Sequence, residues 1–154
     1  MAGNETRDSA AESLTALADE LEHSLGDAVT IDRWAVPGDG VTLTPTRNTA
    51  LAVGWMDFGD EVYLETLGGP GGRWELRRSR QDIEWLESIV RSVIAGRVTE
   101  VFGPSRSQVT VTTEDGKRYS ERGAVAGDGC IPLPFWTRWG QKVKYTPYLE
   151  DTPA

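Results

Sequence analysis

Residues 79–96 read SRQDIEWLESIVRSVIAG, and this stretch carries the clearest structural signal in the chain. Ser79 is followed three residues later by Asp82, a variant of the capping box that begins many helices. Apolar side chains then recur at helical spacing until Gly96, a residue that commonly ends a helix. The stripe consists of Ile83, Leu86, Val90, Val93 and Ile94, widened by Trp85 and Ile89. The stretch therefore predicts an amphipathic helix with one buried face.

Short runs with strand character lie on both sides of this helix. They are rich in β-branched and aromatic residues and are separated by turn residues, as in the strong hairpin signal Asp115-Gly116. The glycine-rich residues 68–72 are interpreted as a flexible turn. Strands are expected at 29–34, 41–44, 49–56, 61–67, 73–77, 97–102, 107–113 and 117–122.

A second helix is expected near the N-terminus. Asp8 or Ser9 can cap it, and Gly26 follows its last residue, Leu25. Leucines at four helically spaced positions make it amphipathic, with acidic residues on the far face. Residues 1–7 and 150–154 are expected to be disordered, and residues 8–149 to form a single domain.

The order of elements predicts an α+β fold. Tight hairpins favour a largely antiparallel curved sheet of about six or seven strands, with two helices packed on one face. The order α-ββββ-α-βββ is followed by an irregular aromatic C-terminal segment. In this order of elements the chain resembles small acidic secretion chaperones and similarly built immunity proteins, which implies a binding function.

Charge is unevenly distributed along the 154 residues, whose net charge is −8. Residues 1–65 hold 13 acids and 3 bases, whereas residues 66–154 hold 11 acids and 13 bases. The acidic half argues against nucleic acid as a partner, because like charges repel along a phosphate backbone. It is compatible with docking on another protein, in particular a basic one. An exposed edge strand would in addition permit a homodimer.

Residues suited to catalysis are few. The chain has one histidine, His23, and one cysteine, Cys130, so a nucleophile with an adjacent base is not indicated. A lone cysteine makes no internal disulfide, and neither a secretory signal nor a membrane span is evident, so a cytoplasmic protein is expected. We expect no enzyme activity and no cofactor.

Two charged clusters are weak candidates for ion binding. Asp57, Asp60 and Glu61 fall in one expected hairpin and could hold a hard cation, although a solvated acidic turn explains them better. A metal site is therefore not expected, and a carboxylate-based hydrolase is the last of the functional alternatives. Four arginines near the start of the central helix could form an anion patch, or could pair with acids of the chain itself. They are Arg73, Arg77, Arg78 and Arg80.

The C-terminal segment 131–148 is the most unusual part of the chain, because it is aromatic and basic and contains no acid. Interfaces are enriched in aromatic residues and arginine, and single-stranded nucleic acid stacks on similar surfaces. Such a segment can also close an open core edge. Residues 141–145 alternate and could form a last edge strand. The candidate binding residues are Phe135, Trp136, Arg138, Trp139, Lys142, Lys144 and Tyr145.

The leading hypothesis is a non-catalytic protein-binding domain, of an inhibitor, immunity or chaperone-like kind, that presents its acidic face to a partner. The alternative is binding of a small ligand or of single-stranded nucleic acid through the C-terminal segment.

Overall fold

The computed structural model describes residues 2–125 and 131–150 and shows two long helices and nine strands. The long helices are α1 (Ala2–Leu25) and α2 (Arg80–Ile94), and two short ones are η1 (Gly26–Ala28) and α3 (Trp136–Trp139). The first five strands are β1 (Val29–Trp34), β2 (Asp39–Pro45), β3 (Val53–Asp57), β4 (Glu61–Thr66) and β5 (Arg73–Arg77). The last four are β6 (Val98–Gly103), β7 (Arg106–Thr112), β8 (Arg118–Ala124) and β9 (Gln141–Lys144).

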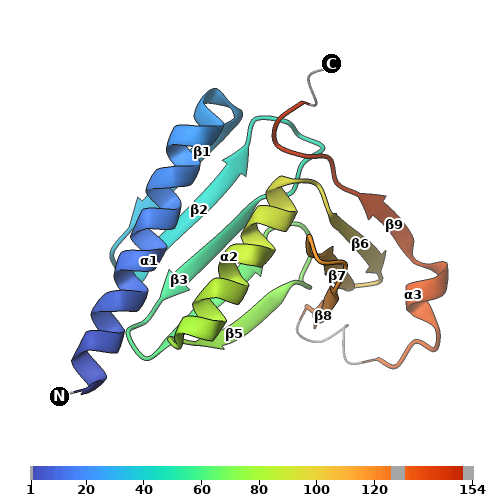
Figure 1. Ribbon diagram of the computed structural model, residues 1–154. Coiled ribbons are helices and arrows are strands. Elements are labelled where there is room, and N and C mark those ends of the chain that lie inside the picture. The colour runs from blue at the N-terminus through green and yellow to red at the C-terminus, as the bar shows by residue number, and fades with distance from the viewer. Residues whose placement is uncertain (1, 126–130, 151–154) are drawn as a thin grey trace.

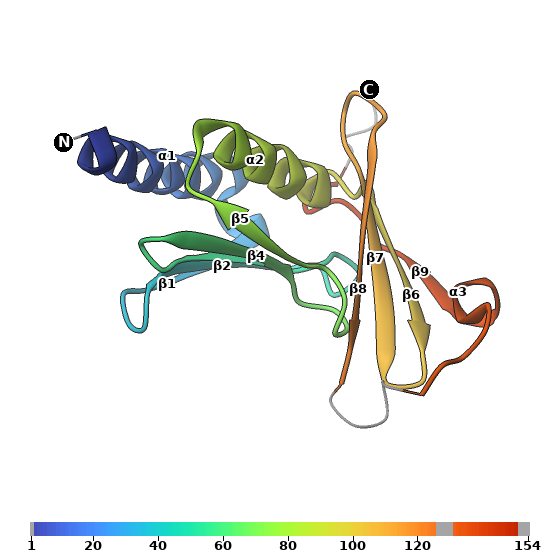
Figure 2. The same ribbon diagram turned by 90° about the horizontal axis from the view of Figure 1, so that it is seen from below.

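The strands form two antiparallel sheets. Sheet A has the order β1-β2-β3-β4-β5, and sheet B has the order β8-β7-β6-β9. Both helices α1 and α2 lie on one face of sheet A, and sheet B stands steeply against the end of that layer (Figures 1 and 2). The predicted α+β class and element order are confirmed. The strands do not form a single curved sheet, however, but divide between two sheets at α2.

The predicted central helix is present as α2. The Ser79 hydroxyl accepts a hydrogen bond from the Asp82 amide at 3.2 Å, as the capping pattern predicts. The helix begins directly after this cap, and Ile83, Leu86 and Val90 are among the residues that it buries against sheet A. In the described residues, neither long helix contains an apolar stretch of the kind needed to cross a membrane.

Helix α1 begins at Ala2, earlier than the cap at Asp8 or Ser9 predicted. Its four predicted leucines are all buried in the common core with α2 and sheet A. Strand β3 begins at Val53, later than predicted, so residues 49–52 form a connecting segment. Burial of the leucine stripe by the chain's own sheet means that this face is core and is not a surface for a partner.

The glycine-rich turn between β4 and β5 is a contact between the two sheets and is not merely a flexible loop. The Gly71 amide donates to Ser107 Oγ at 2.7 Å, and the Gly69 amide donates to Glu100 Oε2 at 2.9 Å. A Cβ atom at Gly123 of β8 would lie 1.9 Å from the Pro70 carbonyl oxygen. Glycine is required at these positions because the backbones of the two sheets approach too closely for a side chain.

After α3, the C-terminal chain runs back from sheet B to sheet A. Strand β9 pairs with β6, and the following residues reach the core, where Tyr148 is 1% exposed. The Tyr148 hydroxyl donates a 2.6 Å hydrogen bond to the Leu51 carbonyl, and its amide donates to Ile94. The segment therefore closes the open end of the core.

Candidate functional site

The aromatic side chains of the C-terminal segment divide into a buried and an exposed group. Trp136 is 7% exposed, and Tyr145 is half-buried. Phe135 is 69% exposed and Trp139 is 55% exposed, although the buried Trp136 lies between them in the sequence. The segment thus closes the core with some rings and presents others to solvent.

Residues 131–140 lie on the outer face of sheet B, which is turned away from α1 and α2 (Figure 2). Trp136 packs on Gly103 of β6, where a Cβ atom would lie 2.8 Å from the indole ring. The buried Arg106 side chain donates to the carbonyl oxygens of Ile131 at 2.7 Å and Pro104 at 3.0 Å. These contacts fix both ends of the turn that carries Phe135.

Phe135 is the N-cap of α3 and has a left-handed backbone, with φ 59° and ψ 21°. A residue with a Cβ atom pays about 1–2 kcal/mol for this conformation, so a phenylalanine here is uncommon. The backbone turns at this residue, and the ring projects into solvent with the Arg138 guanidinium 5.1 Å from its centroid. Backbone strain at an exposed aromatic residue is a feature of binding sites.

Arg122 of β8 extends this surface across the sheet. Its guanidinium lies 5.7 Å from the Trp136 ring, and its Nε donates to the Gln108 side chain. We call the surface formed by Arg122, Phe135, Arg138 and Trp139 the aromatic–arginine patch. Arg122 and Arg138 also line a cavity of about 520 Å³ with Phe135.

The other candidate residues of the segment have different positions. Lys142 and Lys144 are exposed on β9, an edge strand, where lysines protect against pairing with other chains. The Tyr145 hydroxyl donates to the buried Glu100 carboxylate at 2.7 Å. Burial and this carboxylate raise the pKa of Tyr145. Tyr145 therefore connects structural elements and is not presented to solvent with Phe135.

The four arginines of the anion-patch hypothesis do not share one surface role. Arg78 points inward and donates to Asp57 Oδ2 at 2.9 Å, with both side chains at most 10% exposed. Arg80 pairs with Glu84 on the surface of α2, and Arg73 lies over the Tyr63 ring. Arg77 is exposed on β5. The structure thus shows pairing with acids of the chain for two of the four, and a contact with an aromatic ring for Arg73.

The acidic hairpin likewise uses its carboxylates internally. Besides Arg78, Asp57 accepts the Gly59 amide at 2.9 Å, and Glu61 accepts the Tyr63 hydroxyl at 2.8 Å. Asp60 is exposed. Within residues 2–125 and 131–150, no three His, Cys, Asp or Glu side chains form a group suited to a metal ion. His23 is exposed on α1, and Cys130 lies outside the described residues.

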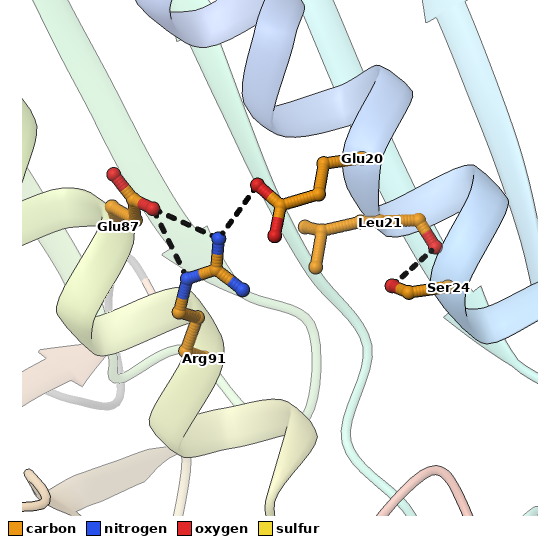
Figure 3. Close-up of polar contacts among 5 residues, drawn as sticks. All are labelled: Glu20, Leu21, Ser24, Glu87 and Arg91. Atoms are coloured by element: carbon orange, nitrogen blue, oxygen red, sulfur yellow. Dashed lines mark hydrogen bonds and ion pairs between the residues drawn. The ribbon is translucent and has the colours of Figure 1, made fainter.

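The acidic face of α1 is partly neutralised by arginines of the chain itself. Arg33 of β1 pairs with Asp19 at 2.9 Å and with Glu22 at 2.8 Å. Glu20 points toward α2, where Arg91 binds it at 2.9 Å and also binds Glu87 (Figure 3). These pairs join α1 to its neighbours and leave less uncompensated negative charge than the composition predicts.

The sequence did not indicate that Arg122 belongs to the aromatic–arginine patch or that Arg106 supports it. Both lie on strands of sheet B whose side chains alternate between the two faces, and an arginine in such a strand normally indicates a solvated face. Only the return of residues 131–140 over this face brings them to Phe135 and Trp136.

Comparison of the chain with models of protein families, with curated proteins and with solved structures gave no match.

Proposed function

We propose that the chain is a non-catalytic protein-binding domain and that the aromatic–arginine patch is its contact surface. The exposure of Phe135 and Trp139, at 69% and 55%, is the observation that carries this proposal. Exposed aromatic rings gain free energy when a partner removes them from water, and tryptophan and arginine are enriched at binding hot spots. The patch combines both residue types.

The support beneath the patch favours the same function. Trp136 is buried next to the exposed Phe135, and Arg106 holds the start of the turn through the Ile131 carbonyl. Because these contacts fix the backbone in advance, little conformational entropy remains to be lost when a partner binds. The Trp139 indole N–H donates to the Pro134 carbonyl at 3.2 Å, which further restricts that ring.

The acidic face of α1 is less suited to this role. Three of its carboxylates already have guanidinium partners, and surface ion pairs of this kind must be broken or shared when a basic partner docks. The aromatic–arginine patch requires no such exchange, because in the described residues neither Arg122 nor Arg138 has an acidic partner. We therefore place the contact surface on sheet B.

The experiment is a quantitative affinity capture in cells that naturally express the chain, with tagged full-length bait. We expect specific partners to be retained by the wild type and reduced at least about tenfold by Phe135→Ser/Trp139→Ser, as for loss of a hot spot. Phe58→Ser is the matched control, because Phe58 is an exposed phenylalanine on the distant β3–β4 turn. Equal partner retention by all three proteins would refute the proposal.

Single-stranded nucleic acid is a second candidate ligand for this surface. Aromatic rings beside arginines can stack on bases, and the patch supplies Phe135, Trp139 and Arg138. Fluorescence anisotropy with labelled dT12 at low salt distinguishes the two. Binding at micromolar concentration that is lost in Phe135→Ser/Trp139→Ser would favour nucleic acid over a protein partner.

A further inference from the structure

A cavity of about 520 Å³ lies beside Phe135 on the outer face of sheet B. Three arginines contribute to its lining, namely Arg106, Arg122 and Arg138. Among the described residues, the others that line it are apolar or uncharged, with Leu133 and Phe135 among them, and none is acidic. In a chain whose net charge is −8, a cavity with this lining is a local reversal of sign.

The interactions of Arg122 and Arg138 leave the positive charges of these two arginines in place. Arg122 donates to the neutral amide of Gln108, and Arg138 lies over the Phe135 ring. Arg106 donates to two backbone carbonyls. In the part of the chain that the structure describes, no salt bridge joins Arg122 or Arg138 to an acid.

We propose that this cavity receives the carboxylate of an Asp or Glu side chain from a linear segment of the partner protein. An adjacent apolar side chain of that segment then packs on Phe135 and Trp139. This inference rests on the proposed function and specifies the chemistry of the partner. A guanidinium group suits a carboxylate because its planar N–H donors match the two oxygens.

The lining of the cavity favours a short acidic segment over a long polyanion. At physiological salt, exposed charges are screened beyond about 8 Å, so one or two carboxylates at the cavity respond mainly to its arginines. Pro132, Leu133 and Pro134 also line the cavity, so they can pack against an apolar side chain next to the carboxylate but offer no charge to further phosphates of a nucleic-acid strand. A short acidic segment of a protein therefore fits this lining better than a nucleic-acid strand does.

The test begins with selection of random 12-residue peptides, displayed on phage, against the immobilised full chain. We expect enrichment of Asp or Glu next to an aromatic or branched apolar residue. Selected peptides are then synthesised, and their affinities are measured by fluorescence anisotropy. Replacement of the peptide's acid by Gln or Asn should weaken binding at least about tenfold, as for loss of a charge-assisted hydrogen bond.

Substitutions in the protein identify the cavity. Arg122→Gln and Arg138→Gln should each weaken peptide binding at least about fivefold, because each removes one charged donor. Arg118→Gln is the matched control, since Arg118 is exposed on the same strand and does not line the cavity. Arg138 is exposed, so its variant should fold normally, and thermal melts of all three variants check this.

The outcomes separate this inference from the proposed function. Enrichment of neutral or basic peptides that depend on Phe135 and Trp139 would overturn the carboxylate inference and leave the protein-binding proposal intact. Enrichment of acidic peptides that bind Arg122→Gln and Arg138→Gln as well as wild type would also overturn it. Absence of any patch-dependent peptide, or dT12 binding in its place, would overturn the inference, and only the cellular capture would then decide the proposed function.

Discussion

The Tyr145 hydroxyl donates a 2.7 Å hydrogen bond to Glu100 Oε1, and this carboxylate is completely buried where the two sheets meet. The second oxygen, Oε2, accepts the Gly69 amide of the loop between β4 and β5. The Glu100 side chain of sheet B thus binds both a loop of sheet A and the C-terminal segment. Burial of a carboxylate is tolerated only where hydrogen bonds replace water, so these contacts stabilise the junction.

Tyr145→Phe removes the hydroxyl from this junction but keeps the ring. The Glu100 carboxylate then loses a buried donor, so we expect the free energy of unfolding to fall by about 1–3 kcal/mol. Urea denaturation measures the change. Tyr63→Phe is the control, because Tyr63 also donates to a glutamate but on the surface, and no measurable loss is expected there. Equal effects of the two substitutions would contradict the structural role of the Glu100 contact.

The buried tyrosines also predict a pH dependence. Burial raises the pKa of both Tyr145 and Tyr148 above the ordinary value of 10.0. The unfolded chain therefore loses these protons at a lower pH than the folded chain does, and stability is lost as pH rises above about 10. Tyr148→Phe should reduce the loss of stability between pH 9 and pH 11, as measured by urea denaturation. An unchanged pH dependence in that variant would argue against the raised pKa.

The Asp57–Arg78 pair joins the end of β3 to the start of α2 in a buried position. Arg78→Met leaves the carboxylate buried beside an apolar side chain, which should cost about 3–5 kcal/mol of stability. Arg80→Met, two residues away, removes an ion pair with side chains 92% and 64% exposed, and little change is expected. Chemical denaturation of both variants checks this contrast, and similar stabilities would contradict it.

The close approach of β8 to the glycine-rich loop gives a further prediction. Gly123→Ala places a methyl group where the Pro70 carbonyl oxygen lies, so the loop must move and stability should fall by about 1–3 kcal/mol. Gly116→Asn is the control for an added side chain in open space: nothing lies within 4 Å of its Cβ position, and asparagine is among the residues that best accept a positive φ such as its 86°, so a smaller loss than at Gly123 is expected. Thermal melts compare the two. A Gly123→Ala variant as stable as wild type would show that the sheets do not touch there.

The sequence predicted α2 and the hairpins correctly because their signals are local. The Ser79 cap and the helical spacing of its stripe lie within a few turns of chain, and Asp115-Gly116 lies within one hairpin. The arrangement of the two sheets involves contacts between residues far apart in the chain, such as Pro70 and Gly123, and no periodic pattern connects such residues. For the same reason a flexible turn was the natural interpretation of the glycine-rich loop.

The candidate site was predicted in part. Composition identified the C-terminal segment, but it could not separate the buried Trp136 from the exposed Trp139. Pro132 and Pro134 precede these residues, and a segment without helical or strand periodicity does not indicate which side chains face inward. Arg122 was not predicted as part of the patch, because the segment that it contacts lies beyond the next turn or hairpin in the chain. Local sequence patterns do not connect residues at that separation. The left-handed backbone of Phe135 has no sequence signal, since glycine or asparagine is the usual residue there.

Phe135 provides the prediction that relates stability to binding. At φ 59°, glycine avoids the steric cost of a Cβ atom, so Phe135→Gly should be more stable than Phe135→Ala by about 1 kcal/mol. Both variants should nevertheless lose binding to the same degree, because both remove the exposed ring. Urea denaturation and peptide anisotropy, measured on the same two proteins, test this. If Phe135→Gly were less stable than Phe135→Ala, backbone strain at this position would be contradicted. A Phe135→Gly variant that is more stable than Phe135→Ala but does not bind would instead indicate that the chain keeps a strained phenylalanine at this turn for the contact that its ring makes.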